Sequence, residues 1–385
     1  MKKVFIDIQP LLKNKTGIGW YAYNIIKRVL KEDHNLIEYC GFGFDFLNKN
    51  NSKSITDEIN FDKIDIYSKI PVRIYKALWN ILPEKYSNLF PNGDLYHYLN
   101  YIVPPIDEAK KVIINVYDMV YKRFPETMKT SNLYMLERDM EKSIYRADKI
   151  ITISENTKNE ILEYFDIDED KISIIAPGID ISCFAKTKEN GLDEKKRIKN
   201  KYKLPDNYFL YFGTIEPRKN IATILRAYAE LQEDIRHEFK LVFSGGMGWK
   251  NKELMSMINQ SGLSDQIVFT GYVEEADKAY IYNMAKIFLF PSLYEGYGMP
   301  ISEAMASGTP VITSNVSSMP EAGGKAASYI SPLDYLAMSK EIEKLLSDEN
   351  YYNEKVNLGV KQAEKFSWDN AAKQTVEVYH ELLGI

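Results

Sequence analysis

Cysteine and histidine are scarce in this chain, which has two cysteines and four histidines among its 385 residues. Cys40 and Cys183 are too few for a disulfide framework or a cysteine metal site. The four histidines are scattered along the chain, which argues against a histidine metal site. We therefore expect no metal centre, and the interior of the cell as the compartment.

Long apolar runs and an excess of positive charge are also missing. No stretch of about 18 apolar residues occurs, so we expect no membrane-spanning helix. The apolar residues near the N-terminus are interrupted by Asp7 and Gln9, which indicates a first strand and not a signal peptide. The net charge of -5 argues against non-specific binding of nucleic acid. With 45% hydrophobic and 27% charged residues, the composition is typical of a soluble cytoplasmic protein.

What the sequence does contain is a regular alternation of short apolar runs and amphipathic stretches. At 385 residues the chain exceeds the usual size of one hydrophobic core, so we expect two domains. Strands that alternate with helices predict an α/β fold with two Rossmann-like parallel sheets. The predicted strands cover residues 4–8, 36–44, 94–97, 111–118, 149–153 and 172–176, then 208–212, 240–244, 267–273, 286–290 and 311–313.

Two segments interrupt this alternation. Residues 185–203 are charged and poor in apolar residues, so we expect the linker between the domains there. Residues 72–90 mix lysine and arginine with tryptophan, leucine and isoleucine. They indicate a helix packed on its own domain and broken at Pro83, with an amphipathic surface that contacts a membrane or a lipid acceptor as the alternative.

The segment FPSLYEGYGMPISEAMASGTP carries the strongest chemical signal. An apolar strand leads into a loop with Glu295, Gly296 and Gly298, and a helix that starts at Pro300 contains Glu303. The glycines allow close approach of the backbone, and the helix N-terminus offers N–H groups and a positive dipole end to a phosphate. We expect Glu303 in the first turn, where it could bind ligand hydroxyls. Two solvated glutamates are the alternative.

Two further constellations follow predicted strands. Arg218 and Lys219 lie in a loop that opens directly into a helix, where two adjacent cations suit a diphosphate. The alternative is a solvated pair of cations on the surface. That alternative is disfavoured because Arg218 and Lys219 lie in the same half of the chain as the loop with Glu295. Gly17, Ile18 and Gly19 form a loop between the first strand and the first helix. That loop lacks the third glycine and the downstream acid of a dinucleotide site, which disfavours a dehydrogenase.

Together these motifs resemble those of the retaining glycosyltransferases of family 4. The matching segments are EGYGMPISE from Glu295 (the family's E-x7-E), GTIEPRKN from Gly213, FTGYV from Phe269 and TGIG from Thr16. The resemblance covers nearly the whole chain. It implies the GT-B fold, in which two Rossmann-like domains face a cleft and a C-terminal helix returns to the N-terminal domain. The implied parts are an acceptor-binding domain at 1–190, a donor-binding domain at 204–366 and the C-terminal helix at 367–385.

The resemblance also assigns roles to residues. Arg218 and Lys219 would neutralise the donor diphosphate as it leaves, without a metal ion or another cofactor. Glu303 would hold the ribose hydroxyls, and Glu295 would contact the transferred sugar. The implied catalytic residues are Arg218, Lys219, Glu295 and Asp118. The implied donor site consists of Gly17, Ile18, Gly19, Gly213, Arg218, Lys219, Ser244, Tyr272, Val273, Glu295, Gly296, Tyr297, Gly298, Met299 and Glu303.

One position departs from the family's pattern. Where many relatives carry a His-Asp pair after the strand at 112–116, this chain has Tyr117 and Asp118. A tyrosine can donate a hydrogen bond to a sugar hydroxyl but is a poor general base, because its unperturbed pKa is about 10. Asp118 is either the polar group on the acceptor side or a brace for its loop. His97 either lies near this site or is a packed interior histidine.

The resemblance implies a retaining hexosyltransferase that uses a nucleotide-diphosphate sugar, at the inner face of the membrane or free in the cytoplasm. GDP-mannose is the favoured donor, because the GTIEPRKN segment resembles that of mannosyltransferases. The acceptor would be a saccharide or a lipid-linked saccharide of surface-polysaccharide assembly. UDP-glucose or UDP-N-acetylhexosamine is the alternative donor. A binding or scaffold subunit without transfer activity is the alternative function.

Overall fold

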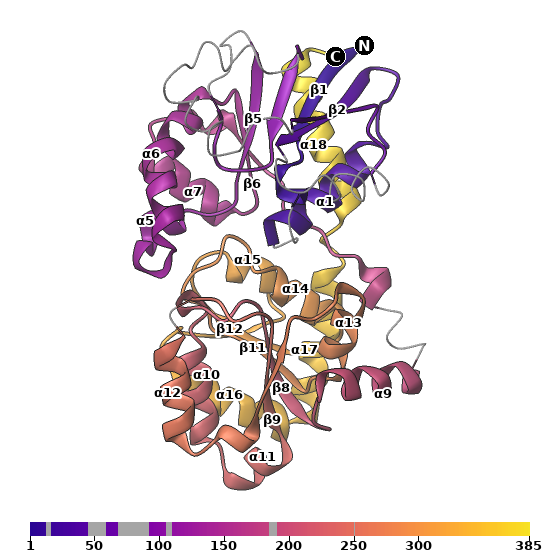
Figure 1. Cartoon of the computed structure of the whole chain (residues 1–385). Helices are drawn as coiled ribbons and strands as arrows, with labels where there is room; N and C mark the ends of the chain where they lie inside the picture. Colours follow the sequence, from indigo (N-terminus) through magenta and orange to yellow (C-terminus); the bar gives the residue numbers. More distant parts are fainter. Residues whose placement is uncertain (13–16, 45–58, 68–91, 105–109, 185–190, 250) are drawn as a thin grey trace. The chain divides into compact units, whose positions relative to one another are not determined.

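The chain forms two compact units, drawn in Figure 1. The computed structural model describes residues 1–12, 17–44, 59–67, 92–104, 110–184, 191–249 and 251–385. The first unit comprises Met1–Tyr121, Thr130–Gly178 and Trp368–Ile385. The second unit comprises Lys122–Lys129 and Ile179–Ser367. The last segment of the sequence therefore belongs to the first unit.

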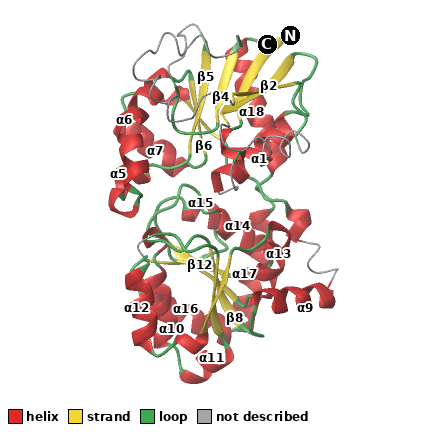
Figure 2. Ribbon diagram, in the orientation of Figure 1, coloured by secondary structure: helices red, strands yellow, loops and turns green. Residues whose placement is uncertain are grey.

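The first unit contains a sheet to which the described residues contribute seven parallel strands, in the order β3-β2-β1-β4-β5-β6-β7. Helices lie on both sides of it (Figure 2), which is why β4 and β6 are buried along their whole length. The strands are β1 (Lys2–Asp7), β2 (Ile37–Phe44), β3 (Lys63–Tyr67), β4 (Leu95–Tyr98), β5 (Lys111–Val116), β6 (Lys149–Thr152) and β7 (Ile172–Ile174). The helices are η1 (Gln9–Leu11), α1 (Gly17–Val29), α5 (Val120–Arg123), which continues into the second unit, α6 (Thr130–Arg146), α7 (Glu155–Tyr164), η3 (Glu169–Lys171) and α18 (Trp368–Leu383).

The second unit contains a sheet of six parallel strands among the described residues, in the order β10-β9-β8-β11-β12-β13. The strands are β8 (Tyr208–Phe212), β9 (Lys240–Ser244), β10 (Ile267–Gly271), β11 (Ile287–Phe290), β12 (Val311–Ser314) and β13 (Ser328–Ile330). The helices are η2 (Pro125–Thr127), α9 (Gly191–Tyr202), η4 (Pro217–Lys219), α10 (Ile221–Glu230), α11 (Glu233–Glu238), α12 (Lys252–Ser261), η5 (Ser264–Gln266), α13 (Glu275–Met284), α14 (Met299–Ala306), α15 (Met319–Gly323), α16 (Tyr335–Ser347) and α17 (Glu349–Ala363). This sheet also has helices on both sides (Figure 2).

Each sheet has one point at which the strand order reverses. In the first unit the chain moves outward from β1 through β2 to β3, then returns to pair β4 with the other side of β1. In the second unit the same reversal separates β8 from β11. Open parallel sheets bind ligands beyond the carboxyl ends of the strands at such a point. The carboxyl ends of β1 and β4, and of β8 and β11, are therefore the places to search for sites.

The C-terminal helix α18 packs on the first unit, as the resemblance implies. Its apolar side makes contacts with α1 and β4, and the ring of Trp368 meets that of Tyr21 at a centroid distance of 5.6 Å. Arg28 on α1 donates to Asp369 at 2.8 Å. The side chains of Val376 and Tyr379 are buried. α18 therefore completes the core of this unit.

The predicted strands agree with the observed ones, and their ends differ by no more than two residues. The α/β fold with two parallel sheets is thus confirmed. Two short strands, β3 and β13, were not predicted. Ser154 caps α7 as its position before a helical pattern indicates, with its hydroxyl accepting a hydrogen bond from Thr157 N at 3.1 Å. The segment 72–90 lies outside the described residues.

The expectation of a linker at 185–203 is wrong for its second part, because residues 191–202 form α9 in the second unit. The helix buries Ile198 and Tyr202. Arg197 and Lys201 bind the buried carboxylate of Asp277 on α13, at 2.6 and 2.7 Å. The helix is therefore anchored by two buried side chains and by these ion pairs, which explains why so few of its residues are apolar. The chain passes into the second unit at residues 178–179, before α9.

Candidate active site

Arg218, Lys219 and Glu295 meet at the reversal point of the second sheet. Arg218 and Lys219 lie in η4, in the connection that follows β8, and Glu295 lies in the loop that follows β11. Arg218 Nη1 is 3.0 Å from Glu295 Oε2, and Lys219 Nζ is 2.5 Å from Glu295 Oε1. Arg218 Nη2 also donates to Glu216 Oε1 at 2.9 Å. Two cations and two carboxylates therefore form one cluster.

The protein backbone fixes this cluster in place. Arg218 Nη1 also donates to the carbonyl of Tyr294 at 2.6 Å. The carbonyl of Glu295 accepts hydrogen bonds from the hydroxyls of Ser317 and Ser318, at 2.5 and 2.8 Å. Although burial favours the neutral acid, the charges of Arg218 and Lys219 outweigh it and lower the pKa of Glu295 to about 2. Glu295 is thus ionised at every physiological pH.

Asn220 joins the two loops that carry the cluster. Its backbone has φ of 55°, in the left-handed region that asparagine tolerates better than most residues. Its side-chain amide donates to the carbonyl of Pro291 at 3.0 Å and to that of Pro332 at 2.5 Å. The loop after β8 is thereby tied to the loop after β11. Asn220 was part of the GTIEPRKN motif, but the sequence did not reveal this structural role.

Glu303 lies apart from that cluster, on α14. The expectation that it occupies the first turn is wrong, because α14 starts at Met299 and Glu303 is its fifth residue. Its carboxylate is held instead by Lys278 Nζ at 2.7 Å and by the hydroxyl of Tyr282 at 3.0 Å, both from α13. Burial acts against the charged form of Lys278, but the carboxylates of Glu303 and Glu275 raise its pKa above the ordinary value. Burial raises the pKa of Glu303 itself above its ordinary value, and the charge of Lys278 acts the other way.

The loop before α14 is buried and offers backbone groups. Gly298, at the N-cap of α14, has φ of 95°, which favours glycine, and Pro300 lies in the first turn, as predicted. Gly296 is buried and Met299 is partly exposed. Tyr297 is only 4% exposed, and its ring packs edge-on against Phe366 at 5.6 Å. Tyr297 is therefore a core residue, and a ligand could meet it only through its backbone.

A close backbone contact shapes the carboxyl ends of β8 and β9. Gly213 N donates to Ser244 O at 2.8 Å, and Gly245 follows with φ of 129°. A Cβ atom on Gly245 would lie 2.1 Å from the carbonyl oxygen of Gly213. The side chain of Ser244 is fully buried. Gly245 is a requirement of the site that the sequence interpretation missed, although the Gly-Gly pair after a strand signals it.

Tyr272 and Val273 follow the edge strand β10. Tyr272 is 72% exposed, whereas Val273 is buried. A large exposed aromatic ring beyond a strand end can stack on a nucleotide base. Val273 can contribute only its backbone.

The N-terminal glycines are arranged differently from the prediction. Gly17, Ile18 and Gly19 are not a loop but the first residues of α1. Gly17 is exposed, Ile18 is partly exposed and Gly19 is buried. A glycine pair at a helix start still leaves free backbone N–H groups there.

Tyr117 is a packing residue. Its hydroxyl donates to the carbonyl of Leu99 at 3.1 Å, and its ring packs edge-on against Tyr21 and Tyr101. Only 5% of the residue is exposed. The position at which the resemblance implies a histidine therefore serves the core of the first unit in this chain. Asp118 accepts a hydrogen bond from Val120 N at 3.2 Å, which favours its role as a brace for the loop.

His97 is a packed interior histidine. Its Nδ1 lies 2.7 Å from the hydroxyl of Tyr379 and its Nε2 lies 2.6 Å from Asn115 Oδ1. Burial lowers its pKa to about 4. The ring is therefore neutral at physiological pH and joins β4, β5 and α18.

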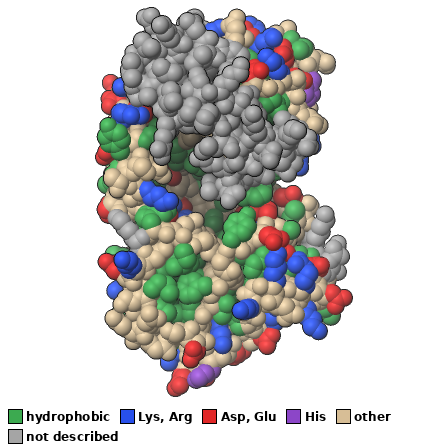
Figure 3. Space-filling view, in the orientation of Figure 1, with side chains coloured by type: hydrophobic (Ala, Val, Ile, Leu, Met, Phe, Trp, Pro, Cys, Tyr) green, Lys and Arg blue, Asp and Glu red, His purple; other side chains and the backbone are tan. Residues whose placement is uncertain are grey.

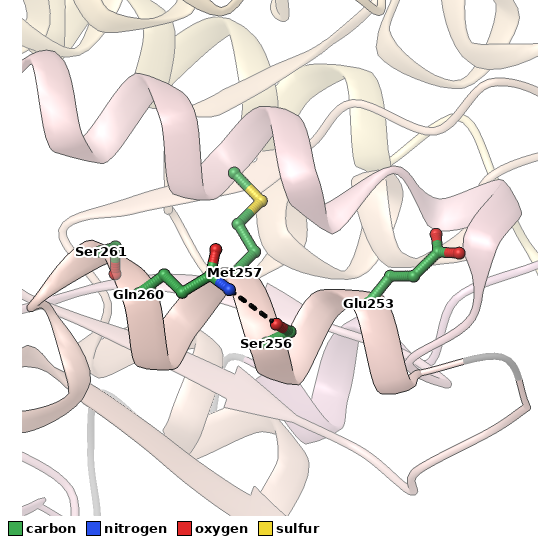
Figure 4. Close-up of a pocket in the computed structure, with 5 residues that line it drawn as sticks. All are labelled: Glu253, Ser256, Met257, Gln260 and Ser261. Carbon is green, nitrogen blue, oxygen red and sulfur yellow. Dashed lines mark hydrogen bonds between the residues drawn. The ribbon is translucent and has the colours of Figure 1, made fainter.

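Other surfaces of the described structure carry weaker evidence of a binding site. Figure 4 shows five residues that line a hollow, Glu253, Ser256, Met257, Gln260 and Ser261, all of which come from α12. It includes none of the residues of the predicted site. In Figure 3, charged side chains of both signs are interspersed on the face of the second unit that is drawn.

The described part of the chain contains no group of histidine, cysteine, aspartate and glutamate arranged to hold a metal ion. Among the described residues, no helix has the length and apolar character needed to cross a membrane.

Comparisons with known proteins agree with this architecture. The family model described as Glycosyltransferase Family 4 matches residues 16–182, and that described as Glycosyl transferases group 1 matches residues 193–363. O-antigen chain mannosyltransferase B of Escherichia coli is 30% identical over 383 residues, which cover 98% of this chain and 99% of that protein. The serotype-specific mannosyltransferase WbdA of Escherichia coli is 35% identical over 240 residues, which are 62% of this chain and 29% of that protein.

Among solved structures, Anabaena HepE in complex with UDP and glucose superposes with a TM-score of 0.75. The match covers 99% of this chain and 100% of that one at 14% identity, so it supports the fold alone. The two family models together span most of both units, and the first relative matches from end to end. The chain belongs to the family 4 glycosyltransferases.

Proposed function

We propose that this glycosyltransferase is a retaining, metal-independent hexosyltransferase of surface-polysaccharide biosynthesis, with GDP-mannose as donor and a saccharide or lipid-linked saccharide as acceptor. The observation that carries the proposal is the buried cluster of Arg218, Lys219 and Glu295 at the reversal point of the second sheet. The names of the relatives in Escherichia coli, which are O-antigen and serotype-specific mannosyltransferases, support mannose as the sugar.

In the proposed mechanism, Arg218 and Lys219 stabilise the leaving group. When the bond between the sugar and the diphosphate breaks, negative charge grows on the departing oxygen. Arg218 offers a planar pair of donors that is already oriented by Glu216 and Glu295, and Lys219 offers a point charge beside it. Donors that are fixed before the reaction need no reorganisation when this charge develops. The same charges make a metal ion unnecessary in the proposed mechanism.

Glu303 and Tyr272 would bind the nucleoside. Lys278 and Tyr282 hold the Glu303 carboxyl group in place, where it would accept hydrogen bonds from the two ribose hydroxyls. The exposed ring of Tyr272 would stack on the base. The buried loop at Gly296 and Gly298 would present backbone N–H groups to the sugar and the diphosphate.

Asp118 remains a proposed acceptor-side residue, although its observed contact is with the backbone of its own loop. The enzyme would work in the cytoplasm, at the inner face of the membrane when its acceptor is lipid-linked.

A calorimetric screen of the purified chain tests the donor. We expect GDP-mannose and GDP to bind at least ten times more tightly than UDP-glucose, UDP-N-acetylglucosamine and ADP-glucose. A preference for uridine nucleotides would replace the proposed donor. Absence of binding to all of them would favour a scaffold subunit. Proton NMR of the transferred sugar tests the stereochemistry: an α-linked mannose is expected from GDP-α-mannose, and a β-linkage would contradict retention.

A further inference from the structure

Asp7 ends β1 at the reversal point of the first sheet. Within β1, Asp7 is aligned with Phe42 of β2 on one side, and the preceding Ile6 is aligned with His97 of β4 on the other. In the second sheet the corresponding point, between β8 and β11, is where Arg218 and Glu295 meet. Ligands of open parallel sheets bind at such points. Asp7 therefore occupies the position in the first unit that the donor cluster occupies in the second.

The surroundings of Asp7, at the carboxyl end of a strand, differ from those of two aspartates at the amino ends of strands in the same sheet. Asp7 is partly exposed, and its Oδ1 accepts a hydrogen bond from Gln9 N at 2.8 Å. Among the described residues, no lysine, arginine or histidine forms an ion pair with it. By contrast, Asp94 and Asp148, which precede β4 and β6, lie 3.8 and 3.1 Å from lysines. Of these three aspartates, Asp7 is the one that lies at the carboxyl end of its strand and has no cationic partner among the described residues.

The groups that face Asp7 are neutral. Tyr117, after β5, is the titratable group whose charge would interact with Asp7, and Tyr21 of α1 packs against Tyr117. Burial raises the pKa of both tyrosines and lowers that of His97 on β4 to about 4. Burial likewise raises the pKa of Asp7 to about 7, while the Gln9 hydrogen bond acts the other way. A carboxylate without a cationic partner destabilises a fold, so its presence at the carboxyl end of β1 points to a ligand.

We propose that the carboxylate of Asp7 binds a hydroxyl group of the acceptor saccharide. A carboxylate accepts hydrogen bonds from sugar hydroxyls, and the oxygen of Asp7 that does not meet Gln9 has no hydrogen-bond donor among the described residues. No covalent bond forms or breaks at Asp7; the residue positions the acceptor. The inference rests on the proposed function and supplies a polar group on the acceptor side, where the hydroxyl of Tyr117 is already used by Leu99.

The test compares Asp7→Asn with a matched control, Asp94→Asn. Both replacements convert a strand-end aspartate of the same sheet to its neutral amide, at opposite edges. The assay measures transfer from GDP-mannose to octyl glycosides of mannose, glucose and N-acetylglucosamine, and uses the glycoside that the wild type glycosylates fastest. We expect Asp7→Asn to raise the KM for that glycoside at least tenfold. Its Kd for GDP-mannose should stay within twofold of the wild-type value. Its melting temperature at pH 6 should stay within a few degrees of the wild-type value.

The pH profile separates binding from a structural role. In the wild type, kcat/KM for the glycoside should rise with pH up to about 7 and then level off, because the ionised carboxylate is the form that accepts a hydrogen bond. Tyr21, Tyr117 and His97 keep their neutral forms over this range. The profile of Asp7→Asn should lack this rise. The profile of Asp94→Asn should retain it.

An unchanged KM for the glycoside in Asp7→Asn, or an unchanged pH profile, would overturn the assignment while the donor site stood. Equal losses in GDP-mannose affinity and glycoside KM would overturn it as well, because they would indicate a general structural effect. If the wild type transfers sugar from none of the nucleotide sugars to any glycoside, the proposed function itself fails. These outcomes keep the two proposals distinguishable.

Discussion

Glu295 determines how much positive charge Arg218 and Lys219 can offer to a ligand. Together with Glu216 it accepts hydrogen bonds from the two cations, so their donors are already engaged in the ligand-free protein. A diphosphate that enters must compete with Glu295 for these donors. The resemblance implies that Glu295 also contacts the transferred sugar, so in the proposed mechanism it would have two roles: to contact the sugar and to limit diphosphate binding.

Replacing Glu295 with glutamine separates these two roles. We expect GDP to bind about threefold more tightly to Glu295→Gln, because a negative charge beside the diphosphate is removed. Turnover of GDP-mannose should fall about a hundredfold, since the contact with the sugar is weakened. Calorimetry with GDP and a coupled transfer assay measure the two effects. Glu253→Gln, an exposed glutamate on α12, is the control, and weaker GDP binding in Glu295→Gln would contradict competition.

Asp7 predicts an inverse dependence of stability on pH. Its pKa is raised in the folded chain, so the folded state binds more protons than the unfolded state between about pH 4 and pH 7. The free energy of unfolding therefore falls as the pH rises through this window, by up to about 4 kcal/mol from this residue. Asp7→Asn removes the group that titrates. Its melting temperature should exceed that of the wild type at pH 8 by about 3 °C or more and match it at pH 4. A wild type that melts higher than Asp7→Asn at pH 8 would contradict the unpaired state of Asp7.

The connections after β8 and β9 show how elements constrain one another. Because a Cβ atom on Gly245 would lie 2.1 Å from a backbone oxygen, neither element can move aside cheaply. We expect Gly245→Ala to cost about 3 kcal/mol of unfolding free energy, from the positive φ and the contact together. Gly246→Ala is the control, since a Cβ there meets nothing within 4 Å. Urea denaturation measures both; equal effects of the two substitutions would show that the backbone relaxes.

At the level of elements, the sequence predicted most of what apolar periodicity controls. The strands that feed the two sheets were found because buried parallel strands are continuous apolar runs. β3 was missed because it is an edge strand of five residues in a polar region, and β13 because it has only three. α9 was taken for a linker because Arg197 and Lys201 are its anchors, and their partner Asp277 is 80 residues away from Arg197 in the sequence.

Only those residues of the candidate site that belong to short sequence motifs could be predicted from the sequence. Arg218, Lys219 and Glu295 were singled out by their motifs, and the fold brings them together. That Glu303 depends on Lys278 could not be read from the sequence, because 25 residues separate them and their contact follows from the packing of α13 on α14. The packing role of Tyr117 likewise needs the positions of rings from other elements.

At the scale of the whole molecule, the first unit depends on the end of the chain. α18 supplies Trp368, Val376 and Tyr379 to its core, and Tyr379 binds His97. Each buried apolar side chain contributes about 1.5–3 kcal/mol, so their sum approaches the total stability of a domain. A chain that ends at residue 367 should therefore have an unfolded first unit. Limited proteolysis and circular dichroism check this. Removal of Gly384 and Ile385 alone should have little effect, and a protease-resistant first unit in the long truncation would contradict the dependence.

The most direct test of the central claim is the binding of GDP-mannose to three variants, measured by calorimetry alongside turnover. Arg218→Ala and Lys219→Ala remove the cations that would meet the diphosphate, and Arg226→Ala removes an exposed arginine from α10 as the control. We predict weaker binding of GDP-mannose and at least a hundredfold loss of turnover in the first two variants, and no change in the third. Arg218→Ala and Lys219→Ala should stay folded by circular dichroism, but with lowered melting temperatures, because each leaves the buried Glu295 with one cation fewer. Turnover that survives in both Arg218→Ala and Lys219→Ala would contradict a donor diphosphate site at this cluster.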